Sequence, residues 1–346
     1  MYVFNSKLFK LIINNIIFIK KYLIHYIKYF FIKIIFYMSL PSFTDISKTT
    51  ISKQIKMLSL DDAIKDFNKL KLIGSNACNM SYRYRTGNNV VDYFTFTERL
   101  NTKGKYDINF YEFIANIEEF KKKKFISNML KFYEDVKNKN KTKNDYIVLK
   151  EVYNICISAI NIFRPLVAME IYTKYKPKCV LDFTCGWGGR LVGACALNIP
   201  NYIGIDINTN LINPYLEMKT FFKNISETNV DIFFEDATKF DYSKITYDMV
   251  LTSPPYYFLE KYSNNKNYSS KNEMKNSFYI PVISNTYKYL QQGGYYCLNI
   301  NKEIYENICI SLLGVATDII SLKKKQRQNN YEEYIYVWYK QDESKK

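Results

Sequence analysis

The chain has 346 residues, of which 47% are apolar, and it carries a formal net charge of +16. This length suggests a main domain of about 200 residues with an appended region. The seven cysteines are odd in number and lack paired short spacings, which argues against a disulfide framework and a zinc site and favours a reducing compartment, the cytoplasm or the nucleus. The single histidine, His25, lies near the amino terminus, so histidine catalysis and histidine-based metal sites are excluded from the rest of the chain.

Residues 1–37 form a basic hydrophobic segment with a charge of +6. Lysines interrupt its Ile, Leu, Phe and Tyr residues, so no uncharged span reaches the ~20 residues of a stable membrane span. Several polar residues recur at helical spacing, as in a basic helix that lies on a membrane surface. Alternatively, Met38 is the true start, and the preceding residues are upstream sequence that is not part of the mature protein. The second interpretation is favoured.

Residues 38–150 are expected to be mainly helical and to form a basic substrate-binding region. They carry a charge of +8, whereas residues 151–346 carry only +2, and clustered Lys and Arg attract polyanions. Within this region, residues 88–100 alternate like a strand. Just before them, the run from Tyr82 to Arg85 interleaves aromatic and cationic side chains. Such a set can stack bases and pair phosphates, or it can form the rim of a core.

Residues 180–191 predict a strand, a glycine-rich turn and a helix in succession. Glycines such as Gly186 and Gly188 let a ligand approach the backbone closely, as in the first βα turn of nucleotide-binding sheets. A second strand ends at Asp206, roughly 20 residues further on, where a ribose-binding carboxylate belongs in such folds. A third strand ends near Asp236. Either acid alone could be a helix N-cap, but their order and spacing favour a cofactor site.

A fourth strand runs into the tetrad Ser253-Pro254-Pro255-Tyr256. Two successive prolines cannot donate to a sheet ladder, so the strand must stop there with its carbonyl groups turned outward. Ser253 Oγ and the Pro254 carbonyl then form a pair of acceptors, and Tyr256 offers a flat ring for stacking. This combination suits an exocyclic NH2 group, which presents two hydrogens and a lone pair conjugated into a ring. In isolation, the tetrad could also be a plain turn.

Three further strands are expected at 295–300, 318–322 and 334–338, after a polar loop at 263–276 and a helix at about 278–291. The loop is a candidate lid, and the last two strands form an antiparallel pair. We therefore expect an α/β fold with a doubly wound, mostly parallel, seven-stranded Rossmann-like sheet and an antiparallel last strand. The acids and the tetrad would then share the carboxyl edge of the sheet, where ligands bind in such folds.

On these motifs, residues 151–340 resemble the Rossmann-type S-adenosylmethionine-dependent methyltransferases that modify exocyclic amino groups of adenine or cytosine in DNA. Residues 181–189 stand where that family has Asp-Pro-Phe-x-Gly-x-Gly, and the tetrad stands where it has (Asn/Asp/Ser)-Pro-Pro-Tyr. Both segments, with Phe163-Arg164-Pro165 upstream, are most similar to DNA methylases of large DNA viruses and phages. Phe183 replaces the usual proline of the family, and Ser253 replaces the Asp of many adenine enzymes, which leaves the target base open.

The resemblance implies a methyltransferase domain over residues 151–346 with S-adenosyl-L-methionine as its cofactor. Ser253, Pro254, Pro255 and Tyr256 would be the catalytic residues. The residues implied at the cofactor are Phe163 and Arg164, closing over the methionine end, Asp182 and Thr184 in the first motif, Gly186 and Gly188 beside the methionine part, Asp206 at the ribose, and Asp236 at the adenine. Trp187 would stack on the cofactor or wedge between helix and sheet, and Arg190 would be a surface or salt-bridge residue.

The expected reaction is methyl transfer to adenine N6 or cytosine N4 in DNA, with the target base flipped out of a duplex. Transfer from a sulfonium to an amino nitrogen needs alignment rather than a strong base. An RNA methyltransferase, a protein-glutamine methyltransferase and a non-catalytic nucleic-acid-binding subunit are the alternatives. The target-recognition domain of the family is missing from residues 151–346, so residues 38–150 must supply any recognition. The sequence leaves open DNA against RNA, the recognition sequence and the oligomeric state.

Overall fold

The computed structural model describes residues 45–80, 84–104, 106–257, 266–322 and 333–341. The basic segment 1–37 lies outside these residues, as do Tyr82, Arg83 and the first part of the expected lid. Within the described ranges, no helix is both long and apolar enough to cross a membrane.

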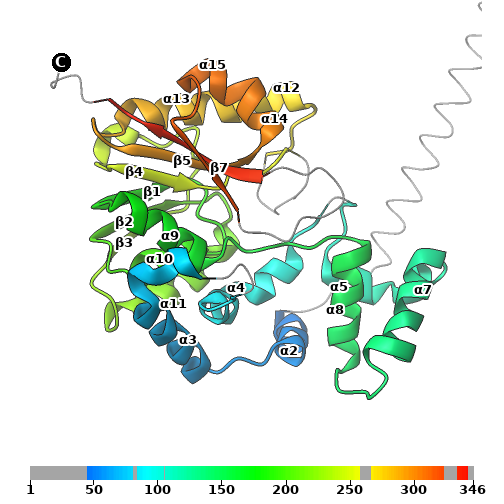
Figure 1. Cartoon of the computed structure of the whole chain (residues 1–346). Helices are drawn as coiled ribbons and strands as arrows, with labels where there is room; N and C mark the ends of the chain where they lie inside the picture. Colours follow the sequence, from blue (N-terminus) through cyan, green and yellow to red (C-terminus); the bar gives the residue numbers. More distant parts are fainter. Residues whose placement is uncertain (1–44, 81–83, 105, 258–265, 323–332, 342–346) are drawn as a thin grey trace, which may run out of the picture.

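A seven-stranded sheet forms the centre of the molecule, in the order β3-β2-β1-β4-β5-β7-β6 (Figure 1). Strand β7 is antiparallel to both of its neighbours, and the other adjacent pairs are parallel. The strand order reverses between β1 and β4, which makes the topological switch point where such sheets bind ligands. The strands are β1 Cys179–Asp182, β2 Asn201–Ile205, β3 Asn229–Phe233, β4 Met249–Thr252, β5 Tyr295–Asn301, β6 Asp318–Ser321 and β7 Glu333–Tyr339. The predicted fold class is confirmed.

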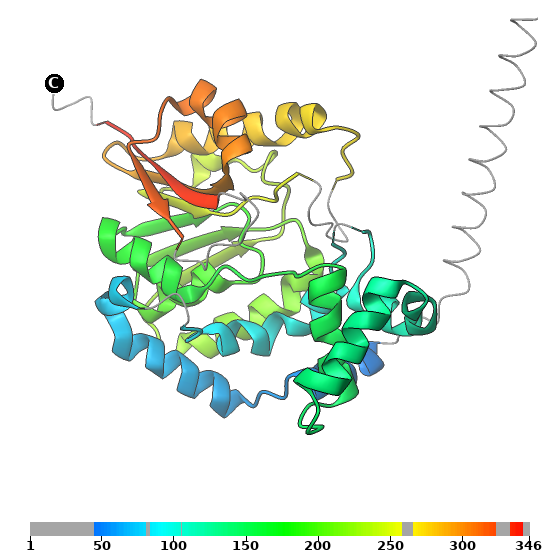
Figure 2. The same cartoon turned by 45° about the vertical axis from the view of Figure 1, so that its right-hand side comes forward.

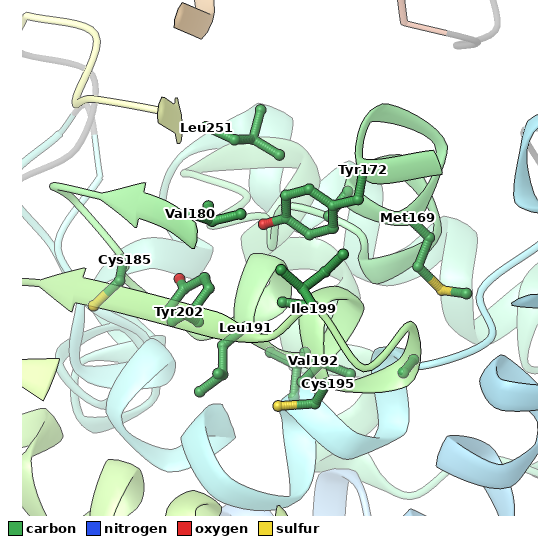
Figure 3. Packing of buried hydrophobic residues seen from close by; sticks show 14 of the residues in the cluster. Met169, Tyr172, Val180, Cys185, Leu191, Val192, Cys195, Ile199, Tyr202 and Leu251 are labelled. Carbon is green, nitrogen blue, oxygen red and sulfur yellow. The ribbon is translucent and has the colours of Figure 1, made fainter. Parts of the chain in front are cut away.

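Successive side chains of each central strand enter different cores. Val180 packs on one face of the sheet and Leu181 on the other, because neighbouring residues of a strand point to opposite sides. Both faces are covered by helices, so the central strands β1, β2, β4 and β5 are largely apolar rather than alternating with polar residues. The helices on the first face are α9 Pro165–Tyr175, α10 Gly189–Ala196 and α11 Ile212–Lys223. Figure 3 shows Tyr172 and Tyr202 packed within this core.

The second face is covered by the helices that follow β4 and β5 (Figure 1). The helix predicted at 278–291 begins earlier in the structure, at Lys271. Three helical segments follow one another there without a break and end at Tyr289. The helical elements of this face are α12 Lys271–Met274, η5 Lys275–Tyr279, α13 Ile280–Tyr289, α14 Lys302–Ile304, η6 Tyr305–Cys309 and α15 Ile310–Leu313. The short turn η4 Tyr242–Lys244 packs in the same core, and the short turn η3 Thr209–Leu211 packs on the first face.

The described residues before Pro165 are mainly helical, as predicted, and divide between two cores. Helices α3 and α4 contribute Phe67, Leu70, Val90 and Val91 to the core beneath α9 and α10. The turn η1 joins this core through Ala77, whereas α2, η2 and the helices α5 to α8 pack on one another around Phe110 and stand apart from the sheet (Figure 2). The elements are α2 Asp45–Ile55, α3 Leu60–Ile73, η1 Gly74–Asn79, α4 Asn88–Asn101, α5 Phe110–Ala115, α6 Ile117–Lys121, α7 Lys124–Phe132, η2 Tyr133–Lys137 and α8 Asp145–Cys156.

The strand expected at residues 88–100 is wrong, because these residues form helix α4. Their β-branched and aromatic residues favour a strand locally, but two tertiary interactions favour the helix. Val90 and Val91 are fully buried between α4 and its neighbours. The buried carboxylate of Asp66 in α3 accepts hydrogen bonds from the backbone N–H groups of Gly87, at 2.8 Å, and Asn89, at 3.0 Å. It thereby satisfies donors that a helix start leaves open.

Candidate active site

The turn after β1 is held in place by backbone and side-chain hydrogen bonds. The Cys185 N–H donates to the Ile205 carbonyl at the end of β2 (2.9 Å), and the Tyr215 hydroxyl donates to the Gly186 carbonyl (3.0 Å). Gly186 and Gly188 both have positive φ, 52° and 80°, a conformation that favours glycine. The predicted strand, glycine turn and helix are therefore present.

The two glycines differ in what surrounds them. A Cβ atom on Gly186 would meet only the Thr184 carbonyl, at 3.8 Å, so the space beside this glycine is open to a ligand. A Cβ atom on Gly188 would lie 2.9 Å from Met218 Sδ. Gly186 thus fits a cofactor-contacting role, whereas the missing side chain of Gly188 makes room for the protein itself.

Asp206 connects the glycine turn to the loop after β2. Its Oδ2 accepts a hydrogen bond from the Gly186 N–H (2.7 Å), and its Oδ1 accepts one from the Asn208 N–H (2.9 Å). Burial raises the pKa of Asp206, and the two N–H donors partly oppose that rise. The Asp206 residue is only partly exposed, next to the open space beside Gly186, and each oxygen keeps a lone pair that can accept a ribose hydroxyl.

Asp236 follows β3 and caps a turn. Its Oδ1 accepts hydrogen bonds from the N–H of Thr238 (2.9 Å) and from the hydroxyl of Thr238 (2.7 Å). This is the capping role that an isolated acid is expected to have. The contact with a cofactor adenine implied by the resemblance stays a prediction.

Asp182 has a different place from the predicted one at the cofactor. Its side chain is fully buried, and both oxygens are occupied. Oδ2 accepts from Arg190 Nε and from the Tyr202 hydroxyl, both at 2.6 Å, while Oδ1 accepts from Arg190 Nη2 at 3.0 Å and from Thr252 Oγ1 at 2.7 Å. A fully buried carboxylate with four such hydrogen bonds stabilises the strands and the turn beneath the site and has no surface left for a ligand.

Arg190 is correspondingly buried rather than on the surface, and the salt bridge expected for it is present. Its Nη2 also donates to the Thr184 carbonyl (2.5 Å), and its guanidinium lies 5.0 Å from the centre of the Phe163 ring. Thr184 Oγ1 lies 2.6 Å from Thr252 Oγ1. The ion pair therefore joins the turn after β1 to the end of β4.

Phe163 and Arg164 lie at different places around this turn. The Phe163 carbonyl passes so close to Gly189 that a Cβ atom there would be 1.8 Å from its oxygen. The Arg164 side chain instead lines a small cavity beside Tyr84, Glu170 and Leu322, between α9 and the end of β6. The structure thus brings Phe163 to the glycine turn and assigns the Arg164 side chain to another surface.

The tetrad is fastened to the neighbouring strand by Asn299 of β5. Asn299 Nδ2 donates to Ser253 Oγ (3.0 Å) and to the Tyr256 hydroxyl (2.9 Å), and the Tyr256 hydroxyl donates to the Asn299 carbonyl (2.9 Å). The Tyr279 hydroxyl donates to the Pro255 carbonyl. Residue Tyr257, directly after the tetrad, has φ 49°, in the left-handed region that non-glycine residues rarely adopt.

Asn299 is a site residue that the sequence reasoning missed. The available signal was a polar residue inside the apolar run from Tyr295 to Ile300, where the residue is 4% exposed. Trp187, for which two roles were open, is buried in the core beneath the turn and so wedges between helix and sheet. Among the described residues, no group of His, Cys, Asp and Glu side chains is arranged to hold a metal ion.

Residues 177–341 match the model of a protein family described as RNA cap guanine-N2 methyltransferase. TrmN from Thermus thermophilus superposes with a TM-score of 0.36 and 16% identity over 51% of this chain and 48% of that one, so the match spans about half of TrmN. An rRNA methylase from Streptococcus thermophilus superposes with a TM-score of 0.35 and 12% identity, over 53% of this chain and 100% of that one. NSun6 from Pyrococcus horikoshii with SFG superposes with a TM-score of 0.35 and 14% identity, over 49% of each chain. No curated protein sequence matches.

The sheet order, the glycine turn with its strand-end acid and the family match define one class of enzyme. The protein is an S-adenosylmethionine-dependent methyltransferase with a Rossmann-like fold. The residues present fit that cofactor, because an open glycine and a carboxylate with unused lone pairs lie next to each other at the switch point of the sheet.

Replacing Arg190 with Met should destabilise the protein strongly. The buried carboxylate of Asp182 would lose its cation, and breaking a buried pair in this way costs about 3–5 kcal/mol. The free energy of unfolding from urea titration would measure the loss. Lys174→Met is the matched control, because the Lys174–Asp318 pair is about half-exposed and such pairs contribute at most ~1 kcal/mol. Equal, small losses in both variants would show that the buried pair is not a structural anchor.

Asp206→Asn should weaken S-adenosylmethionine binding about tenfold or more, because hydrogen bonds to a charged acceptor are worth ~1.5–3 kcal/mol. Titration calorimetry would measure the affinity. Asp231→Asn, which neutralises an exposed carboxylate on β3, should leave it unchanged. An Asp206 variant with wild-type affinity would remove this carboxylate from the cofactor site.

Proposed function

We propose that this enzyme methylates an exocyclic amino group of a nucleobase in a nucleic acid. The observation that carries the proposal is the fixed geometry of the tetrad at the end of β4, beside the glycine turn. Asn299 donates to Ser253 Oγ from one side, and a serine oxygen has two lone pairs. One lone pair is left to accept a hydrogen from a planar NH2 group.

The tetrad can align such an amino group without a general base. Ser253 Oγ and the Pro254 carbonyl can each accept one N–H hydrogen, which directs the nitrogen lone pair away from the ring plane and towards the cofactor side. The bound cofactor supplies an electrophilic methyl group on a sulfonium. As the new bond forms, the excess proton on nitrogen becomes acidic and can pass to water. Positioning is then the main contribution of the protein.

Two observations support two candidate substrates, an RNA and a DNA. The family match over residues 177–341 supports guanine N2 in RNA. The tetrad, with its resemblance to DNA methylases, supports adenine N6 or cytosine N4 in DNA as the second candidate. The positive charge of residues 38–150 suits either polyanion and favours both over a protein-glutamine substrate. We place the reaction in a reducing compartment, cytoplasm or nucleus, in line with seven cysteines that are all free thiols.

Methyl transfer from labelled S-adenosylmethionine to capped RNA, uncapped RNA, DNA and protein in parallel tests this function. We expect label in a polynucleotide, and chromatography of the digested nucleosides would identify the base and the nitrogen. N2-methylguanine in RNA would support the family match, and N6-methyladenine or N4-methylcytosine in DNA would support the second candidate. Label in protein alone would refute the proposal.

Substitutions in the tetrad should lower the single-turnover rate and leave cofactor affinity nearly intact. Ser253→Ala removes one acceptor, and Tyr256→Ala removes a stacking surface worth ~1–3 kcal/mol per base, so the second change should be the more harmful. The sequence alone predicts a mild effect for Tyr256→Phe, because the ring does the stacking. The structure changes this expectation, since the hydroxyl holds the ring against Asn299.

We therefore expect Tyr256→Phe and Asn299→Ala to slow turnover by a similar factor, roughly tenfold, because each removes hydrogen bonds of ~1 kcal/mol from the same anchor. Tyr289→Phe, at a more exposed tyrosine on α13, is the matched control and should be neutral. Wild-type turnover in both Ser253→Ala and Tyr256→Ala would mean that the tetrad is only a turn.

A further inference from the structure

A second candidate site lies in the helical region, outside the cofactor site. An open cleft of about 260 Å³ is bounded by the end of α2, by α4 and by α8. Its walls carry three cationic side chains, Lys56, Arg99 and Lys150, and one acidic side chain, Glu151. Glu151 is paired with Lys143 at 2.7 Å, so it does not neutralise the other three cations.

The three cations have one carboxylate among them. Asp92 forms ion pairs with both Lys56 and Arg99. The Arg99 side chain is only 10% exposed, yet its Nη1 has no hydrogen-bond partner among the residues that the structure describes. A nearly buried guanidinium nitrogen without an acceptor costs free energy that an incoming oxyanion would recover.

Lys150 has no carboxylate of its own in the described part of the chain. Its Nζ donates to the neutral Asn154 Oδ1 (2.6 Å) and lies over the Tyr153 ring, 4.9 Å from the ring centre. Burial, together with the charge of Arg99, lowers the pKa of Lys150 to about 7. Arg99 and Lys150 are thus held close together without enough carboxylates to balance their charges. An anionic ligand would stabilise this arrangement.

Helix α4 connects this cleft with the cofactor site. Glu98, the residue before Arg99, accepts hydrogen bonds at Oε1 from Asn210 Nδ2 (2.9 Å) and Asn208 Nδ2 (3.4 Å). Asn208 in turn donates its N–H to Asp206. The opposite wall of the cleft contains residues 159–161, which lead directly to Phe163 beside the glycine turn. The cleft therefore lies on the side of the molecule that carries the cofactor site.

We propose that the cleft lined by Lys56, Arg99 and Lys150 binds a backbone phosphate of the polynucleotide substrate. This inference rests on the proposed function and identifies the part of the basic helical region that binds the polyanion. Arg99 supplies a planar fork that matches phosphate oxygens, and the two lysines supply point charges at its sides.

The test compares Lys150→Gln and Lys56→Gln with Lys53→Gln in the full chain. Lys53 is an exposed lysine three residues before Lys56, so its replacement makes the same charge change outside the cleft. Fluorescence anisotropy of a labelled RNA oligonucleotide and of its DNA counterpart would be measured over a range of salt concentrations. Calorimetry with S-adenosylmethionine on each variant shows whether the fold and cofactor site are intact.

Each cleft variant should lose one phosphate contact, which reduces the slope of log affinity against log salt by about 1 and weakens binding roughly eightfold near 0.1 M salt. Lys53→Gln should change neither quantity by a comparable amount. If all three variants behave alike, the cleft is not a phosphate site, although the proposed function stands. If wild-type protein binds S-adenosylmethionine but neither binds nor methylates any polynucleotide, the proposed function itself fails, and this inference fails with it.

Discussion

The ion pair between Asp182 and Arg190 is the constraint on which the active site depends. Both side chains are buried, and together they bond to Tyr202 of β2, Thr252 of β4 and the Thr184 carbonyl of the glycine turn. A buried charge is tolerated only while its partners stay in place, so a shift of any of these elements would leave it uncompensated. The pair therefore fixes β1, β2, β4 and α10 relative to one another beneath the cofactor.

The ion pair also helps to fix the tetrad, through Thr252. Thr252 bonds to Asp182 and lies next to Ser253, so the cofactor turn and the tetrad share a single anchor. Asn299 of β5 holds the other side of the tetrad. Ser253 is thus fixed between two strands. A reaction that relies on alignment needs this rigidity, because small displacements of a reacting group are costly in rate.

The helical region is part of the same system rather than a separate module beside it. Asp66 of α3 fixes the start of α4, Glu98 of α4 contacts the loop that carries Asp206, and Arg99 lines the cationic cleft. One helix consequently links the packing of the sheet, the cofactor loop and the surface proposed for the polyanion. Residues 38–150 carry a net positive charge as a whole. The cationic cleft is the place where the fold brings three of these cations together with only the Asp92 carboxylate between them.

The sequence by itself determined the strands, the glycine turn, the strand-end acid Asp206 and the tetrad. These features follow from local chemistry: short apolar runs, the freedom of glycine at positive φ and the inability of proline to extend a sheet. Only the tertiary structure decided that residues 88–101 form a helix, that Asp182 lies beneath the cofactor site, and that Asn299 belongs to the site. Each of these depends on distant partners, since 70 residues separate Asp182 from Thr252 and 46 separate Ser253 from Asn299. Burial and pairing across such distances leave no local pattern in the chain.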